Sequence, residues 1–219
     1  MSISAGPKIE KDNLVLYLDA NNEKSCFKES MLIEYLIIGG GGAGRNHTTS
    51  TSTGGGGGGA GGVLQGETEV TEQAYTIAVG AGGISSGDAT TSKGEDSSAF
   101  GLTAVGGGAG SSRINTGSSG GSGGGGNYDY TTGNSGTSGQ GNSGGNGNTS
   151  SAIGYPGGGG GGAGSSGGSG TSISAGNGGK GIYSAITGEY KGYAGGGGGA
   201  IGNNSAFHNG VASEGGGDG

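Results

Sequence analysis

This chain of 219 residues is poor in the features on which most folded domains depend. Hydrophobic residues make up 27% of it, far below the usual share of a globular domain, so it cannot bury a large apolar core. Its single cysteine, Cys26, excludes an intrachain disulfide and therefore the small secreted scaffolds built on such bonds. Two prolines are too few for a collagen triple helix, which also needs a strict Gly-X-Y repeat.

Basic residues and long apolar stretches are scarce as well. The formal net charge is −7. The basic residues beyond position 30 are scattered along the chain, at Arg45, Lys93, Arg113, Lys180 and Lys191. No basic patch for nucleic acid is therefore expected. The longest apolar stretch, Met31–Ile38, is too short to span a bilayer, so no membrane insertion is expected.

What the chain has instead is glycine, with 67 residues that fall largely in runs. Gly54–Gly62 and Gly157–Gly164 each contain a single alanine and otherwise only glycine. Other tracts keep glycine at every third position, as at Gly133, Gly136 and Gly139, with Ser, Thr, Asn or Gln mostly between them. A flexible Gly/Ser linker has a similar composition. It does not explain why the glycines sort into pure runs and period-three tracts.

An ordered structure that fits these runs is a bundle of polyglycine II helices. Such a helix has three residues per turn and no internal hydrogen bonds, so its backbone groups must pair with neighbouring helices. A β-sheet, by contrast, is weakened by interior glycine. A helix surrounded by others must be nearly pure glycine, whereas an outer helix needs glycine only at every third position. We expect roughly eight to ten short helices, with Gly57 on an inner one and Ser143 on an outer one.

The expected fold class is mostly irregular and β: a small N-terminal β-region, a bundle of polyglycine II helices, and loops at the ends of the bundle. Strands are expected at Leu14–Leu18, Met31–Ile38, Tyr75–Val79 and Ser98–Val105. Residues 1–30 carry most of the lysines and one glycine, which indicates a docking or attachment segment. Residues 31–219 are expected to form the glycine-rich domain, with β-structure over about 31–105.

Motifs that resemble nucleotide or catalytic sites lack the surroundings that such sites need. Gly39–Gly44 fits G-x-G-x-x-G, but the residues after it do not favour the helix that a dinucleotide site requires. Gly117–Gly121 fits G-x-S-x-G, but the two histidines, His47 and His208, stand in separate loops with no acid at a telling spacing. We therefore expect no enzyme, no cofactor and no metal site.

Aromatic residues gather in the segments between the glycine runs. Loops on a rigid scaffold are where binding residues concentrate, and tyrosine gives a large contact area with little loss of entropy. The simpler alternative, that each tyrosine only covers the bundle, stays open. The candidate binding residues are Tyr128, Tyr130, Tyr155, Tyr183, Tyr190 and Phe207.

The apolar strand and glycine run of Met31–Gly44 resemble the opening of the glycine-rich domain found in many bacteriophage tail and virion proteins. Tyr75–Gly83 and Thr103–Gly108 continue the resemblance in the same order, and it extends over about residues 31–219. The arrangement is also similar to the distal adhesins of T-even-type phages, in which polyglycine helices form a sandwich and distal loops touch the host receptor.

The resemblance implies a virion protein, and we expect a tail-fibre tip or adhesin whose loops contact a host surface receptor. The alternative is a structural or decorating element of the particle without a receptor, such as a head fibre or neck appendage. Residues 1–30 are expected to join other virion proteins. The oligomeric state stays open, and a homotrimer is one state that suits a fibre.

Overall fold

The computed structural model describes residues 30–45, 53–85, 92–113, 115–149, 154–202 and 208–214. Within these ranges the chain forms no helix and six strands. The strands are β1 (Met31–Ile38), β2 (Val63–Val70), β3 (Ser97–Ala99), β4 (Leu102–Ala104), β5 (Ile182–Ser184) and β6 (Lys191–Tyr193). They pair antiparallel as β1–β2, β3–β4 and β5–β6. The fold is mostly irregular and β, as the sequence predicts.

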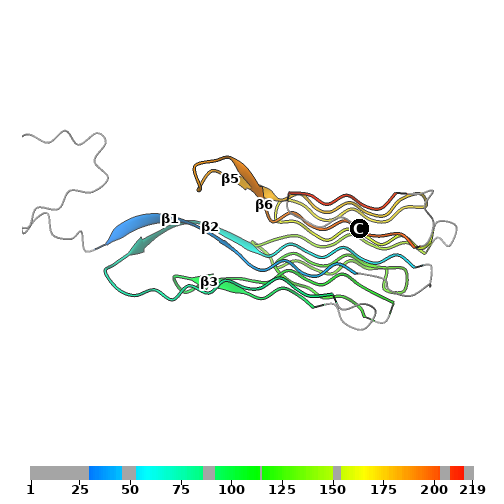
Figure 1. The fold of residues 1–219 in the computed structure, drawn as a ribbon, viewed down its shortest axis with the longest axis horizontal. Coiled ribbons are helices and arrows are strands. Elements are labelled where there is room, and N and C mark those ends of the chain that lie inside the picture. The colour runs from blue at the N-terminus through cyan, green and yellow to red at the C-terminus, as the bar shows by residue number, and fades with distance from the viewer. Residues whose placement is uncertain are drawn as a thin grey trace, which may run out of the picture.

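The longest hairpin, β1–β2, pairs over its full length and projects from one end of the glycine runs (Figure 1). With β3 and β4 it encloses a small apolar core of Ile37, Ala99 and Ala104. Partly buried side chains pack against this core: Tyr35, Leu64, Phe100 and Leu102. Hydrophobic stabilisation grows with the apolar area buried. A core made largely of alanine therefore leaves most of the fold to other interactions.

The glycine runs lie side by side as extended, undulating chains that reverse direction at both ends (Figure 1). Gly54–Gly62 exchanges backbone hydrogen bonds with five other segments, and it does so with a period of three. The N–H groups of Gly56, Gly59 and Gly62 donate to Ser111, Gly108 and Val105, and their carbonyls accept from Arg45, Gly42 and Gly39. Gly57 and Ala60 instead donate to a different segment, at Gly158 and Gly161. Every third residue thus bonds to the same neighbour.

The buried runs leave no room for side chains. Every residue of Gly54–Gly62 is buried, and a Cβ added at Gly57 would lie 2.3 Å from the carbonyl oxygen of Gly197. At the surface the constraint disappears: a Cβ at Gly41 would meet nothing within 4 Å, and Ser143 is exposed. The difference between inner and outer positions that the run lengths predict is present at Gly57 and Ser143.

Polar side chains complete the hydrogen bonding of the outer segments. The Nδ2 group of Asn142 donates to the carbonyls of Gly162 and Ala163, at 2.9 and 3.0 Å. Gln140 ties the β-region to its neighbour in the same way, since its Nε2 donates to the carbonyl of Thr103 at 3.0 Å. The amide side chains that stand between period-three glycines therefore add hydrogen bonds to backbone carbonyls of the neighbouring segments.

One expected strand is confirmed and another is wrong in its extent. β1 covers Met31–Ile38, as the apolar run predicts. Ser98–Val105 was expected to be a single strand, but the structure divides it into β3 and β4. The reason is local: Phe100 and Gly101 have positive φ angles of 55° and 76°, which turn the chain back into a hairpin.

Tyr75–Val79 is not a strand, because only Ala78 pairs, with Ser98 of β3. The expected strand at Leu14–Leu18 lies outside the described residues. Two features were missed. β2 continues directly from a buried glycine run, and the β5–β6 hairpin lies in Ile182–Tyr193, a segment interpreted as loop.

Candidate functional site

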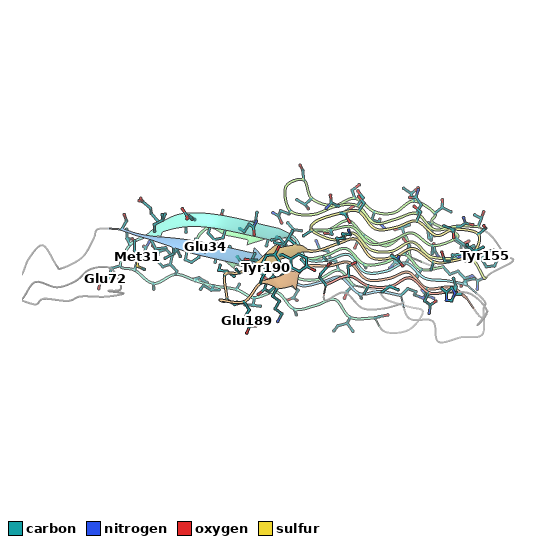
Figure 2. The ribbon with its side chains drawn as sticks, turned by 90° about the horizontal axis from the view of Figure 1, so that it is seen from above. Met31, Glu34, Glu72, Tyr155, Glu189 and Tyr190 are labelled. Carbon is teal, nitrogen blue, oxygen red and sulfur yellow. The ribbon has the colours of Figure 1, made fainter. Side chains whose placement is uncertain are left out.

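The candidate tyrosines fall into two groups at opposite ends of the glycine runs. Figure 2 shows Tyr155 at one end and Tyr190 at the other, where the β-region begins. Met31 lies beyond Tyr190, at the end of the described molecule opposite Tyr155 (Figure 2). Phe207 lies outside the described residues. The five candidates that the structure describes therefore do not form one site.

We call Tyr128, Tyr130 and Tyr155 the end tyrosines. The rings of Tyr128 and Tyr155 contact each other, with centroids 4.6 Å apart and planes inclined by 36°. Tyr155 is held by its backbone: its φ is 57°, that of Gly154 is 81°, and its carbonyl accepts from the N–H of Gly54 at 3.1 Å. Burial raises the pKa of Tyr128, and the neighbouring Asp129 adds to the shift.

A tight turn positions Tyr130. Asn127 has no exposed surface, and its Oδ1 accepts a hydrogen bond from the backbone N–H of Tyr130 at 2.8 Å. In return, the N–H of Asn127 donates to the carbonyl of Tyr130 at 3.0 Å. Asparagine favours such turns because its short side chain can bond to nearby backbone. The result is a fixed loop from which the Tyr130 side chain, 38% exposed, meets solvent.

A polar groove of about 470 Å³ adjoins this turn. Its lining offers hydroxyl, amide and carboxylate groups and one aromatic ring, but no lysine or arginine. The lining residues are Thr116, Ser119, Asp129, Tyr130, Thr131, Thr132, Gly133, Asn134 and Ser135. Such a surface can hold a hydrogen-bonding ligand and offers no cation for an anionic one.

The second group is a pair of stacked tyrosines on the β5–β6 hairpin. Tyr183 and Tyr190 lie with ring centroids 5.1 Å apart and planes inclined by 15°. The Tyr183 hydroxyl donates to Oε1 of Glu214 at 3.2 Å, and the N–H of Gly181 donates to Oε2 of the same carboxylate at 2.8 Å. This hydrogen bond and the negative charge of Glu214 raise the pKa of Tyr183.

Glu214 was missed as a partner of Tyr183, and no local sequence signal points to it. The two residues lie in different segments, and their contact depends on how the glycine runs align. The pairing of Tyr128 with Tyr155 depends on the same alignment. Sequence reasoning identified the tyrosines, but it could not pair them.

In the described part of the chain, no group of three or more His, Cys, Asp or Glu side chains lies close enough together to hold a metal ion. His208 is exposed, and His47 lies outside the described residues. A search of the described residues for helices long and apolar enough to cross a membrane finds none.

Comparison with known proteins gives the family. Residues 24–219 match the family described as glycine-rich domain, and the chain belongs to this family. No curated protein and no solved structure matches it.

Proposed function

We propose that the glycine runs are polyglycine II helices and that together they form a rigid scaffold. The support is the period of three in the hydrogen bonds of Gly54–Gly62. A polyglycine II helix has three residues per turn, so every third backbone group points to the same neighbour. A β-strand alternates between two sides and would bond with a period of two.

On this scaffold the chain serves as a bacteriophage virion protein, at the tip of a tail fibre or as an adhesin that contacts a host surface receptor. It carries no catalysis of its own. The resemblance of Met31–Gly44 and the later runs to glycine-rich virion domains supports this assignment. Residues 1–30 join the chain to other virion proteins.

The observation that carries this function is the aromatic end of the bundle. The Tyr128–Tyr155 ring pair and the exposed Tyr130 stand beside a polar groove, at the end of the described molecule opposite Met31. Attachment through residues 1–30 leaves this end facing outward. Fixed aromatic rings next to hydrogen-bonding groups are the composition typical of binding loops.

The proposal is tested by competition for host cells. Purified chain is added to host cells before particles that carry the chain, and the rate of particle adsorption is measured. Wild-type chain should slow adsorption, and the Tyr128→Ala/Tyr130→Ala variant should lose at least tenfold in potency. Tyr190→Ala is the matched control, since it removes an exposed tyrosine at the other end and should compete like wild type.

Circular dichroism spectra that match the wild type will establish that the double variant keeps its fold. A wild-type chain that does not compete, or a folded double variant that competes equally well, overturns the assignment of receptor contact to the end tyrosines.

A further inference from the structure

Residues 76–80 form an open edge beside β3. Ala78 exchanges two backbone hydrogen bonds with Ser98 of β3, both at 2.9 Å. In an extended chain the backbone groups of successive residues point to opposite sides. Those of Ile77 and Val79 therefore point away from β3, and within the described part of the chain they make no hydrogen bond.

Two apolar side chains at this edge, those of Ile77 and Val79, continue the core face of β3. Because Ala78 pairs antiparallel with Ser98, Ile77 stands opposite Ala99 and Val79 stands opposite Ser97. Side chains of directly opposite residues project from the same face of a sheet, so Ile77 and Val79 lie on the face of Ser97 and Ala99. Ser97 and Ala99 are buried, whereas Ile77 is 64% exposed and Val79 is 86% exposed. The face that is buried at Ser97 and Ala99 therefore continues onto Ile77 and Val79, where it is exposed to solvent.

Within the described part of the chain, this edge lacks the features that usually block another strand. Natural edge strands usually carry charges, a proline or a bulge that prevents pairing with a second chain. The sequence from Tyr75 to Ile84 contains no charged residue and no proline. β3 itself lies on the side of the molecule away from the β5–β6 hairpin (Figure 1), so that hairpin does not cover the edge.

The edge is complementary to itself. When two copies lie antiparallel with Ala78 opposite Ala78, Ile77 of each copy stands opposite Val79 of the other. Each such pair exchanges two backbone hydrogen bonds, which gives four between the copies. The four β-branched side chains meet on one face, and the small alanines occupy the two-fold axis.

We propose that residues 76–80 are the contact between two copies of this chain, which associate as a two-fold homodimer through antiparallel pairing of this edge. Closed two-fold dimers are the commonest homo-oligomers, and they use the same patch on both subunits, as here. The contact lies in the β-region, so it leaves the end tyrosines free. This inference is independent of the proposed function.

Sedimentation equilibrium of the full chain over a range of concentrations tests the contact. We expect a monomer–dimer equilibrium that Val79→Lys weakens at least tenfold, because it sets two like charges into the apolar face. Ile173→Lys is the matched control: Ile173 is 66% exposed and lies in a different segment, so its dimer should be unchanged. A chain that stays monomeric, one that forms trimers, or a dimer that Val79→Lys leaves intact overturns the proposal.

The backbone part of the contact has its own test. Ile77→Pro removes an N–H group that makes no hydrogen bond within the described chain, and proline is tolerated at an edge whose N–H faces outward. This variant should keep the circular dichroism spectrum of the wild type and lose at least tenfold in dimer affinity. Undiminished affinity would contradict pairing through the backbone.

The register is checked by cross-linking in a Cys26→Ser background. The proposed register brings the two Ala78 Cα atoms to about 4.5 Å, within reach of a disulfide. Ala78→Cys should therefore form a covalent dimer with a mild thiol oxidant. Thr76→Cys is the control, since the two copies of residue 76 lie about 13 Å apart along the strands. Efficient cross-linking of Thr76→Cys, or none of Ala78→Cys, contradicts this register.

Discussion

The backbone N–H of Gly57 donates to the carbonyl of Gly158 at 2.9 Å, which joins two glycine runs that are far apart in the sequence. The carbonyl of Gly57 accepts in turn from the N–H of Gly125 at 2.8 Å. Neither bond involves a side chain, and both depend on the close approach of bare backbone. The fold is held together largely by such main-chain contacts of long range.

Gly57→Ala should therefore be severely destabilising. Its Cβ would lie 2.3 Å from the carbonyl oxygen of Gly197 and 2.8 Å from the nitrogen of Gly160, so the surrounding runs must move apart. Overpacking costs about 1–3 kcal/mol or more, and we expect the upper part of this range for the loss in unfolding free energy. Urea titration followed by circular dichroism measures it.

Gly41→Ala is the matched control for that variant. The substitution is the same, but the new Cβ meets nothing within 4 Å. Replacing glycine where the backbone allows it changes stability by less than about 1 kcal/mol, through the unfolded chain. Equal losses in the two variants would show that the runs are not packed as the structure describes.

The heat capacity change of unfolding should be unusually small. Exposure of apolar surface raises it and exposure of polar surface lowers it, which gives about 12–15 cal/mol/K per residue in ordinary domains. Here the buried runs expose mainly peptide groups when they unfold, because the buried apolar cluster of the described chain is small: Ile37, Ala99 and Ala104, with four partly buried side chains packed against it. Differential scanning calorimetry should give a value per residue clearly below the ordinary range. A value within it would point to a larger apolar core.

Asn142→Ala tests the amides that complete the outer segments. It removes the two hydrogen bonds that Nδ2 donates to Gly162 and Ala163, and we expect a loss of about 1–2 kcal/mol in unfolding free energy. Ser143→Ala, at the exposed neighbouring position, should stay within about 0.5 kcal/mol of wild type. Urea titration of both variants decides whether the amide contacts contribute.

The contact of Tyr183 with Glu214 predicts a dependence on pH. The raised pKa means that the folded chain holds this proton more tightly than the unfolded chain. The stabilisation is therefore complete below the pKa of an unfolded tyrosine, about 10, and is lost as the pH rises through the folded pKa.

Glu214→Gln removes the carboxylate charge, so the midpoint of the Tyr183 titration should fall. Nuclear magnetic resonance of ring-labelled tyrosines, with Tyr183→Phe to assign the signal, follows this midpoint. Tyr75 is the internal control, because its pKa is lowered by hydrogen bonds from Thr71 and Gln73 and has no link to Glu214. An unchanged Tyr183 midpoint would mean that Glu214 does not hold this hydroxyl in solution.

Local sequence patterns predicted what depends on local chemistry. The apolar run Met31–Ile38 gave its strand without error, and run length separated the buried Gly57 from the exposed Ser143. Local patterns failed where a turn interrupts an apolar segment. The turn at Phe100 has a positive φ, and a phenylalanine gives no indication in the sequence of such a backbone angle.

For the candidate residues, too, the sequence predicts local features but not the contacts between distant segments. The gaps between glycine runs located the tyrosine-bearing segments, one of which is the β5–β6 hairpin and not a loop. The pairing of Tyr128 with Tyr155, and of Tyr183 with Glu214, could not be predicted because it depends on the alignment of separate glycine runs. Glycine carries no side chain that could specify this alignment in the sequence. The open edge at Ile77 and Val79 was likewise invisible, since an alternating apolar pattern also fits a covered strand.

The most direct test of the proposed function is to locate the chain in its parent particle. Antibodies against the purified chain, coupled to gold, are applied to intact particles and viewed by electron microscopy. Gold at the tips of tail fibres is the predicted result. Gold on the head or neck would contradict an adhesin and favour a structural element, and particles without gold would contradict a place in the virion.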